Sequence, residues 1–101
     1  MSNPAPNEIP HLLVHEEADN VGVVVVEGLT AGTDMLCCVT QDNSTFRLIA
    51  GSDVPIGHKI ALVDLKDGGT AIKYGEDIGK IVADIPKGAH VHTHNCKTKR
   101  W

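Results

Sequence analysis

The C-terminal part of the chain carries the side chains best suited to chemistry. In the segment His90-Val91-His92-Thr93-His94-Asn95, histidines occupy every second position. We predict an extended strand over residues 90–94, in which alternate side chains share a face, so that the three imidazoles point the same way. Imidazoles gathered in this way can ligate a metal ion, carry a proton near neutral pH or bind an anionic substrate. A solvent-facing strand that happens to be rich in histidine is the alternative.

The composition limits the classes of function that need to be considered. The chain has 101 residues, enough for one domain with a small core, and a formal net charge of −4. This acidic balance argues against nucleic acid as the main partner, and an aromatic content of only 3% argues against base-stacking platforms. The longest apolar run, Val21–Val26, is too short to cross a bilayer. We therefore expect neither a nucleic-acid partner nor a membrane partner.

The N-terminus and the cysteines indicate the compartment. Residues 1–10 are polar and rich in proline, with no basic segment leading into an apolar one, so they are not typical of a signal peptide. Three cysteines, of which Cys37 and Cys38 are adjacent, do not make a disulfide framework. Neighbours on a strand face opposite ways, so we expect one thiol in the core and one outside. These features predict a reduced, cytoplasmic protein.

The rest of the chain reads as a series of short β-strands that must position the histidines. No window shows a helical period over three turns, and turn signals recur about every ten residues. Residues 1–10 are expected to be a flexible leader, 11–95 the folded domain and 96–101 a basic C-terminal tail. Gln41–Ser44 is expected to be a hairpin turn, and the unbroken valines suggest that the second strand is covered on both faces. The predicted strands are 11–15, 21–27, 35–40, 45–50, 58–65, 70–74, 78–85 and 90–94.

A recurring four-residue frame marks the corners between these strands. Each frame is an apolar residue, two further residues and then glycine, and in three of the four an aspartate stands directly before the apolar residue. Glycine supplies the permissive backbone that closes a tight turn, and proline, present in two frames, presets its second position. Many short strands with reused corners predict a compact, strongly bent all-β domain. The frames are Leu29–Gly32, Val54–Gly57, Leu65–Gly68 and Ile85–Gly88.

These segments, taken in order, resemble a known family. Val54-Pro55-Ile56-Gly57-His58-Lys59-Ile60-Ala61-Leu62, then Ile72–Gly75 with Ile78-Gly79, then Gly88 followed by His90–Asn95, are similar to the SAF domain of the altronate and galactarate dehydratase family. Asp19–Val23 resembles the opening strand of that family. The resemblance runs from about His15 to Asn95 and implies an all-β fold of the small β-clip type.

The resemblance also implies an activity and a partner. Members of this family are metal-dependent lyases that act on sugar acids and related 2-hydroxy acids, and the SAF segment accompanies a larger catalytic region or subunit. Lys97–Trp101 and Val21–Leu29 are most similar to the small subunits of members that release sulfite from (2R)-sulfolactate to give pyruvate. We therefore expect a small subunit that is inert without its larger catalytic partner. A part of an altronate- or galactarate-type dehydratase, and a non-catalytic module that binds a metal or a small molecule, are the alternatives.

The site residues follow from this chemistry and from the family pattern, which covers His92, His94 and Asn95. β-Elimination from a small anionic 2-hydroxy acid needs a base, help for the leaving group and a cation. We expect a divalent metal ion, Fe²⁺ in the first place, bound by this chain or mainly by the larger subunit. His90 stands at a position that varies in the family and is not assigned. The expected roles are catalysis by His58, His92 and His94, substrate binding by Lys59 and Asn95, and metal ligation by His92 and His94.

Overall fold

The computed structural model describes residues 9–73 and 76–97, and within them the chain forms nine short strands and no helix. The predicted all-β fold class is confirmed. The described residues also contain no helix long and apolar enough to cross a membrane. The strands are β1 (Leu12–Val14), β2 (Val21–Val24), β3 (Asp34–Val39), β4 (Ser44–Ile49), β5 (Lys59–Ala61), β6 (Thr70–Lys73), β7 (Glu76–Ile81), β8 (His90–Val91) and β9 (Cys96–Lys97).

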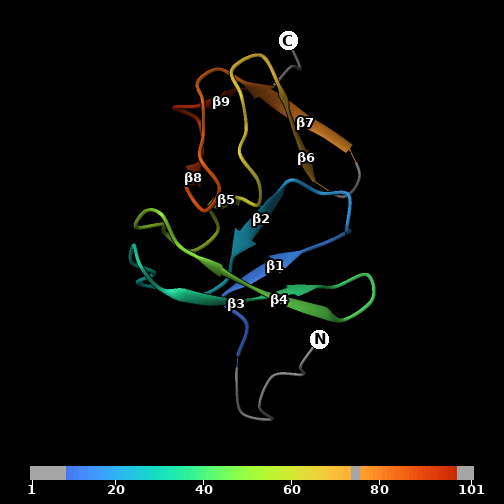
Figure 1. The fold of residues 1–101 in the computed structure, drawn as a ribbon, viewed down its shortest axis with the longest axis vertical. Helices are drawn as coiled ribbons and strands as arrows, with labels where there is room; N and C mark the ends of the chain where they lie inside the picture. Colours follow the sequence, from blue (N-terminus) through green and yellow to red (C-terminus); the bar gives the residue numbers. More distant parts are fainter. Residues whose placement is uncertain (1–8, 74–75, 98–101) are drawn as a thin grey trace.

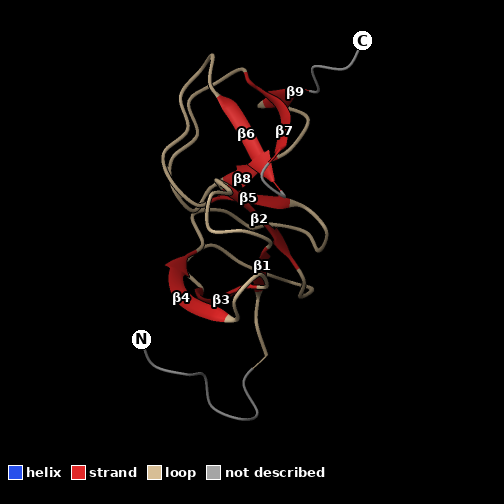
Figure 2. Cartoon of the chain, turned by 90° about the vertical axis from the view of Figure 1, so that its right-hand side faces the viewer, coloured by secondary structure: helices blue, strands red, loops and turns tan. Residues whose placement is uncertain are grey.

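The strands form two sheets at opposite ends of the molecule. The larger sheet has the order β4-β3-β1-β2-β5-β8, and the smaller sheet has the order β6-β7-β9. Figure 1 shows the β3–β4 ribbon at the bottom, β6, β7 and β9 at the top, and β2 and β5 between them, and the turned view in Figure 2 agrees. Among the strands of residues 9–73 and 76–97, only β1 and β3 pair in parallel. The histidine strand β8 is one of the two outer strands of the larger sheet and lies beside β5.

The eight predicted strands all occur in the predicted order, but several are shorter than expected. The fifth was expected over 58–65 and comprises only Lys59–Ala61, and the seventh ends at Ile81 instead of continuing to 85. In both places a corner interrupts the strand. The second strand ends at Val24, and the Val25 side chain is 37% exposed, so the expected cover on both faces does not extend to this residue. The predicted end of the sixth strand, at residue 74, lies outside the described residues.

The prediction of an extended strand over 90–94 is wrong beyond Val91. Residues 92–95 form a turn, and the chain then enters β9, so two residues assigned to the C-terminal tail belong to the smaller sheet. The cause is local. The Asn95 amide oxygen accepts a hydrogen bond from the His92 N–H at 2.9 Å, and the His92 carbonyl accepts bonds from the N–H groups of Asn95 and Cys96. The His92 backbone is thereby satisfied within the turn instead of in a strand ladder.

The four predicted corners are confirmed, because the glycine that ends each frame has a positive φ. The angles are 89° at Gly32, 86° at Gly57, 91° at Gly68 and 88° at Gly88. The corners also pair with one another through antiparallel bridges, Leu29 with Val54 and Leu65 with Ile85. Each bridge therefore joins two corners that lie at least twenty residues apart in the sequence.

The aspartates that precede three of the frames link the paired corners. The Asp53 carboxylate accepts a hydrogen bond from the Ala31 N–H at 2.9 Å. In the second pair, Asp84 accepts one from the Asp67 N–H at 2.9 Å, and Asp64 accepts one from the Lys87 N–H at 2.8 Å. Each carboxylate satisfies a backbone donor that the turn leaves without a ladder partner.

Two apolar clusters form the core, and β2 and β5 contribute to both. Val24 and Ile60 belong to the first cluster, between the strands of the larger sheet, whereas Val21 and Ala61 belong to the second, which joins that sheet to the smaller one. Of the adjacent cysteines, Cys37 is fully buried, burial raises its pKa to about 12, and Cys38 is partly exposed. One thiol therefore lies in the core and one outside, as the sequence predicts.

Candidate functional site

His58 is fixed by the second corner and by β2. The Gly57 N–H donates a hydrogen bond to the Val24 carbonyl at 2.8 Å, and the Val24 N–H donates one to the His58 carbonyl at 2.9 Å. The His58 N–H also closes the turn onto the Pro55 carbonyl at 3.1 Å. His58 therefore enters β5 with its backbone held on both sides.

The register of β5 against β8 brings His58 to the C-terminal histidines. The two strands are antiparallel, with Ile60 opposite His90 and Lys59 opposite Val91. Extending this register by one residue puts His58 across from His92. The two imidazoles stack, with ring centroids 3.8 Å apart and an angle of 14° between the planes. Backbone pairing thus positions two histidines that are far apart in the sequence.

Three imidazoles form the centre of the site. His58, His90 and His92 each offer a ring nitrogen, and these nitrogens all lie within 4.8 Å of one another. His58 Nδ1 and His90 Nε2 are 2.8 Å apart, which is a hydrogen-bond distance. The His90 ring also stacks loosely on both partners, at 5.0 Å from His58 and 5.6 Å from His92. We call these three residues the imidazole cluster.

Asn95 holds the turn that carries two members of the cluster. Its side chain is buried, with 8% exposure, and both ends of its amide are engaged. The amide oxygen accepts the His92 N–H, as described above, and the amide nitrogen donates to the His90 carbonyl at 2.8 Å. Asn95 therefore fixes the spacing of His90 and His92 through their backbones. In this arrangement its amide is occupied by the protein, and a contact with substrate stays a prediction.

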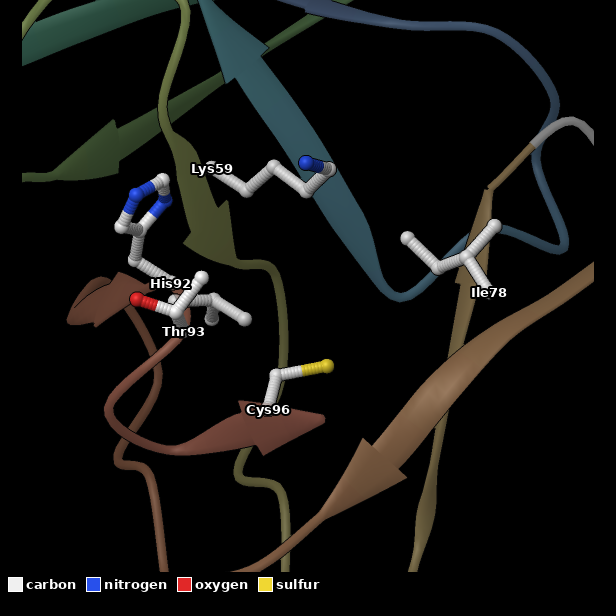
Figure 3. A pocket seen from close by; sticks show the side chains of 6 residues that line it. Lys59, Ile78, His92, Thr93 and Cys96 are labelled. Carbon is white, nitrogen blue, oxygen red and sulfur yellow. The ribbon is translucent and has the colours of Figure 1, made fainter. Parts of the chain in front are cut away.

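Lys59 lies on the other face of β5 and lines a pocket beside the cluster. Successive residues of a strand face opposite ways, so Lys59 points away from His58. The pocket has a volume of about 230 Å³ and is lined by Lys59, Ile78, Val91, His92, Thr93 and Cys96. Figure 3 shows His92 and Ile78 at opposite ends of it, with the Lys59 side chain extending toward the end where Ile78 lies. His92 is thus common to the cluster and to the pocket, which opens between the two sheets.

Desolvation and the neighbouring charged groups disfavour the protonated forms of His90 and His92. The pKa of His90 lies below its ordinary value, mainly because the ring is partly desolvated and also because His58, His94 and His92 are near. The pKa of His92 is lowered by desolvation, by His58, and by the nearby Lys59 ammonium group. Both rings are therefore neutral near pH 7, the state in which an imidazole can act as a base or as a metal ligand.

The predicted site residues are gathered in one region, although not in the predicted arrangement. His58 and His92 stack, and Lys59 lies at the adjoining pocket. His94 is exposed, and its ring centroid lies 5.3 Å from that of His90 at an angle of 50°, outside the group of three. Metal ligation by the pair His92 and His94 stays a prediction.

Two residues of the site were not among the predicted ones. His90, unassigned because its position varies in the family, is a member of the imidazole cluster. The position of His90 in the alternating histidine motif was the signal that could have added it to the predicted site. Cys96 lines the pocket, where desolvation raises the pKa of its thiol, while the nearby Lys59 lowers it. Nothing in the sequence pattern places this thiol in the pocket.

Comparisons with known proteins identify the family of the chain. Residues 10–99 match the model of the altronate/galactarate dehydratase SAF domain. The chain is 70% identical over 67 residues to (2R)-sulfolactate sulfo-lyase subunit alpha of Paracoccus pantotrophus, which covers 66% of this chain and all of that protein. It is 48% identical over 89 residues to the subunit of the same name from Chromohalobacter salexigens, covering 88% of this chain and 95% of that protein.

A larger enzyme matches over the same region. Altronate dehydratase of Escherichia coli is 46% identical over 80 residues, which are 79% of this chain but only 15% of that enzyme. The chain is therefore similar both to separate subunits of its own size and to a small part of a long enzyme. The region that matches the family model includes the corners, the imidazole cluster and Lys59. The chain therefore belongs to the altronate/galactarate dehydratase SAF domain family.

Proposed function

We propose that this chain is the small subunit of a lyase that releases sulfite from (2R)-sulfolactate to give pyruvate, together with a larger catalytic subunit. The observation that carries the proposal is the imidazole cluster beside a pocket that Lys59 lines. High identity to two proteins named as alpha subunits of such a lyase supports the choice of substrate. The proposal assigns the reaction to the cytoplasm, where free thiols such as those of this chain are usual.

The reaction sets two chemical requirements. (2R)-Sulfolactate carries a carboxylate, a hydroxyl on the adjacent carbon C2 and a sulfonate on C3. In a β-elimination a base removes the C2 proton, the electron pair of that bond forms the C2–C3 double bond, and the C3–S bond breaks with its pair on sulfite. The resulting enol takes up a proton at C3 and loses the proton of its C2 hydroxyl to become pyruvate. The site must therefore supply an unprotonated base and a cation for the acid groups.

The residues of this chain can meet both requirements. His92 is neutral near pH 7 and borders the pocket, so it can take the C2 proton, and the stacked His58 can receive or return it. The Lys59 ammonium group would bind the carboxylate or the sulfonate. Asn95 acts in this proposal by holding the turn. His94 is exposed, so it takes part only when the larger subunit encloses it.

A divalent metal ion, Fe²⁺ in the first place, is also part of the proposal. When bound, such an ion would stabilise the negative charge that develops on the substrate. The residues present fit it, because His58, His90 and His92 offer three clustered nitrogen donors of the kind that first-row divalent metals accept. A neutral imidazole has a single free lone pair, so His92 acts either as a ligand of the ion or as the base.

A second candidate is the elimination of water from a sugar acid. The chemistry is the same except that hydroxide, protonated as it leaves, takes the place of sulfite. The 46% identity to the altronate dehydratase of Escherichia coli favours this candidate. It needs the same base and the same cation, so the site alone does not separate the two substrates.

The test is to co-express the chain with the larger subunit and to measure sulfite and pyruvate from (2R)-sulfolactate, with altronate as the parallel substrate. We expect turnover of sulfolactate by the complex and none by either subunit alone. Turnover of altronate alone would establish the second candidate instead. Turnover of sulfolactate by the isolated chain at the rate of the complex would contradict the role of a small subunit.

Two variants test the assigned roles in the same assay. Lys59→Ala should lower kcat/KM roughly 10- to 100-fold, because it removes a charge-assisted hydrogen bond to the substrate. His92→Ala should lower kcat by about 10²–10⁴-fold, the usual contribution of a general base. Lys66→Ala, in an exposed lysine of a distant corner, is the matched control and should leave both constants unchanged. Unchanged kinetics in Lys59→Ala would remove this residue from the site.

A further inference from the structure

We propose that this chain by itself binds a first-row divalent metal ion through His58, His90 and His92, with His94 outside the ligand set. The role of that ion in catalysis would rest on the proposed function, but its binding to the isolated chain does not. The ligand set differs from the pair His92 and His94 that the sequence suggests. It also joins two segments of the chain that lie about thirty residues apart.

The backbone, and not only the side chains, assembles this site. His58 precedes β5, whose pairing with β8 sets His58 across from His92. Its own carbonyl and the N–H of Gly57 are bonded to Val24 of β2, so the segment is held against the centre of the larger sheet. A ligand set on anchored backbone loses little conformational entropy when the metal binds.

The distances suit a three-nitrogen site. With Zn–N bonds of about 2.1 Å, two nitrogens of a tetrahedral site lie about 3.4 Å apart. The nitrogens of the cluster lie within 4.8 Å of one another, and the pair His58 Nδ1 and His90 Nε2 is 2.8 Å apart. The rings of His58 and His92 are stacked nearly parallel, so metal binding would turn them until their lone pairs point at one ion. Three protein ligands leave a coordination position open for a water molecule or a substrate, which is typical of catalytic metal sites.

Asn95 supports two of the ligands from outside the set. The Asn95 amide nitrogen donates to the backbone carbonyl of His90, and the Asn95 amide oxygen accepts from the backbone N–H of His92. The Asn95 side chain is itself buried. Such outer partners fix the orientation of the ligands, and their loss typically weakens metal binding by about 10- to 100-fold. His94 follows the point at which the chain has turned. Its exposed ring lies 5.3 Å from that of His90, and its nitrogens are not part of the group that lies within 4.8 Å, so we leave it out of the set.

The test is a titration of the full chain, purified without a histidine tag, with Co²⁺ followed by its visible absorption, and with Zn²⁺ in competition. We expect one Co²⁺ per chain. His58→Ala, His90→Ala and His92→Ala should each weaken binding by more than about 100-fold, since losing a ligand costs more than losing an outer partner. His94→Ala, the matched control in the same turn, should stay within about threefold, because this residue neither ligates the metal nor orients a ligand.

Two results would overturn this site. One is the absence of Co²⁺ binding by the wild-type chain at millimolar metal. The other is a pattern in which His94→Ala abolishes binding while His58→Ala or His90→Ala retains it, which would restore the pair that the sequence suggests.

A measurement on the wild-type chain covers the case in which a variant fails to fold. Zn²⁺ should shift the imidazole NMR signals of His58, His90 and His92 together, and those of His11 and His15 should not move. Shifts confined to His94, or spread over all six histidines, would refute the assignment. Metal binding without sulfite release by the complex would leave this inference standing and reject the proposed function.

Discussion

His90 and His92 should make the stability of the chain depend on pH in a defined window. The pKa values of His90 and His92 are lowered in the folded chain, chiefly by desolvation and by the neighbouring His58. Below about pH 6.5, the ordinary value for histidine, the unfolded chain therefore binds more protons than the folded chain. Stability should be full above this pH and should fall as the pH decreases toward the folded-state values.

Thermal unfolding in the presence of a chelator checks this expectation. The melting temperature at about pH 5.5 should lie below that at about pH 7.5, whereas about pH 7.5 and about pH 8.5 should give the same value, because the imidazoles are already neutral. In His90→Gln the difference between the two lower pH values should shrink, because one of the crowded rings is gone. An equal or larger difference in this variant would show that the cluster is not its source.

At the scale of residues, the sequence indicated that histidines form the site, but it did not indicate which imidazole rings contact one another. Alternate spacing drew attention to His90, His92 and His94, of which the first two lie in the imidazole cluster, and the corner before His58 indicated the second segment. The spacing assumed an extended strand, however, and Asn95 bends the chain after Val91. Which ring meets which depends on the pairing of β5 with β8, a long-range contact that spacing along one segment cannot encode.

At the scale of elements, the corners are what the sequence predicted best. The glycine at the end of each frame predicted a backbone with positive φ, because this conformation is costly for residues with a side chain. The lengths of the strands were overestimated, because apolar residues such as Leu65 and Ile85 continue the strand pattern into the corners. Their burial comes from corner bridges and not from longer strands.

Gly88 should be the least replaceable of the four corner glycines. It donates its N–H to the Ala61 carbonyl, accepts the Gly51 N–H, and precedes the histidine segment. A Cβ at this position would lie 2.5 Å from the Ile49 carbonyl oxygen, whereas a Cβ at Gly68 would meet nothing within 4 Å. Both glycines have φ near 90°, so the pair separates crowding from backbone strain.

Gly68→Ala should therefore cost only the strain, about 1–3 kcal/mol of unfolding free energy. Gly88→Ala should cost that amount and about 1–3 kcal/mol more for the overlap. Urea unfolding of the two variants measures the difference. Equal losses would mean that the backbone around Ile49 yields without cost, and the corner would then not constrain the histidines that follow it.

At the scale of the whole molecule, the two apolar cores share the strands β2 and β5 in a way that no local pattern predicts. The parallel pairing of β1 with β3 and the bridges between corners join residues that are distant in the sequence. β2 and β5 each place residues in both cores, so neither core is complete without them. Since His58 enters β5, the imidazole cluster is ordered only where this shared region is folded.

This sharing predicts that the chain unfolds as one cooperative unit. Ile81 is fully buried in the second core, and Ile81→Ala should cost about 2–5 kcal/mol of unfolding free energy, as deletions of buried aliphatic groups do. Amide hydrogen exchange should then report the same loss for β3, which lies in the first core only, as for β7. If β3 kept the protection it has in the wild-type chain while β7 lost its own, the two cores would be independent. The pocket between the sheets would then open without unfolding the cluster, and Lys59 would be free to move relative to the lining that Ile78 provides.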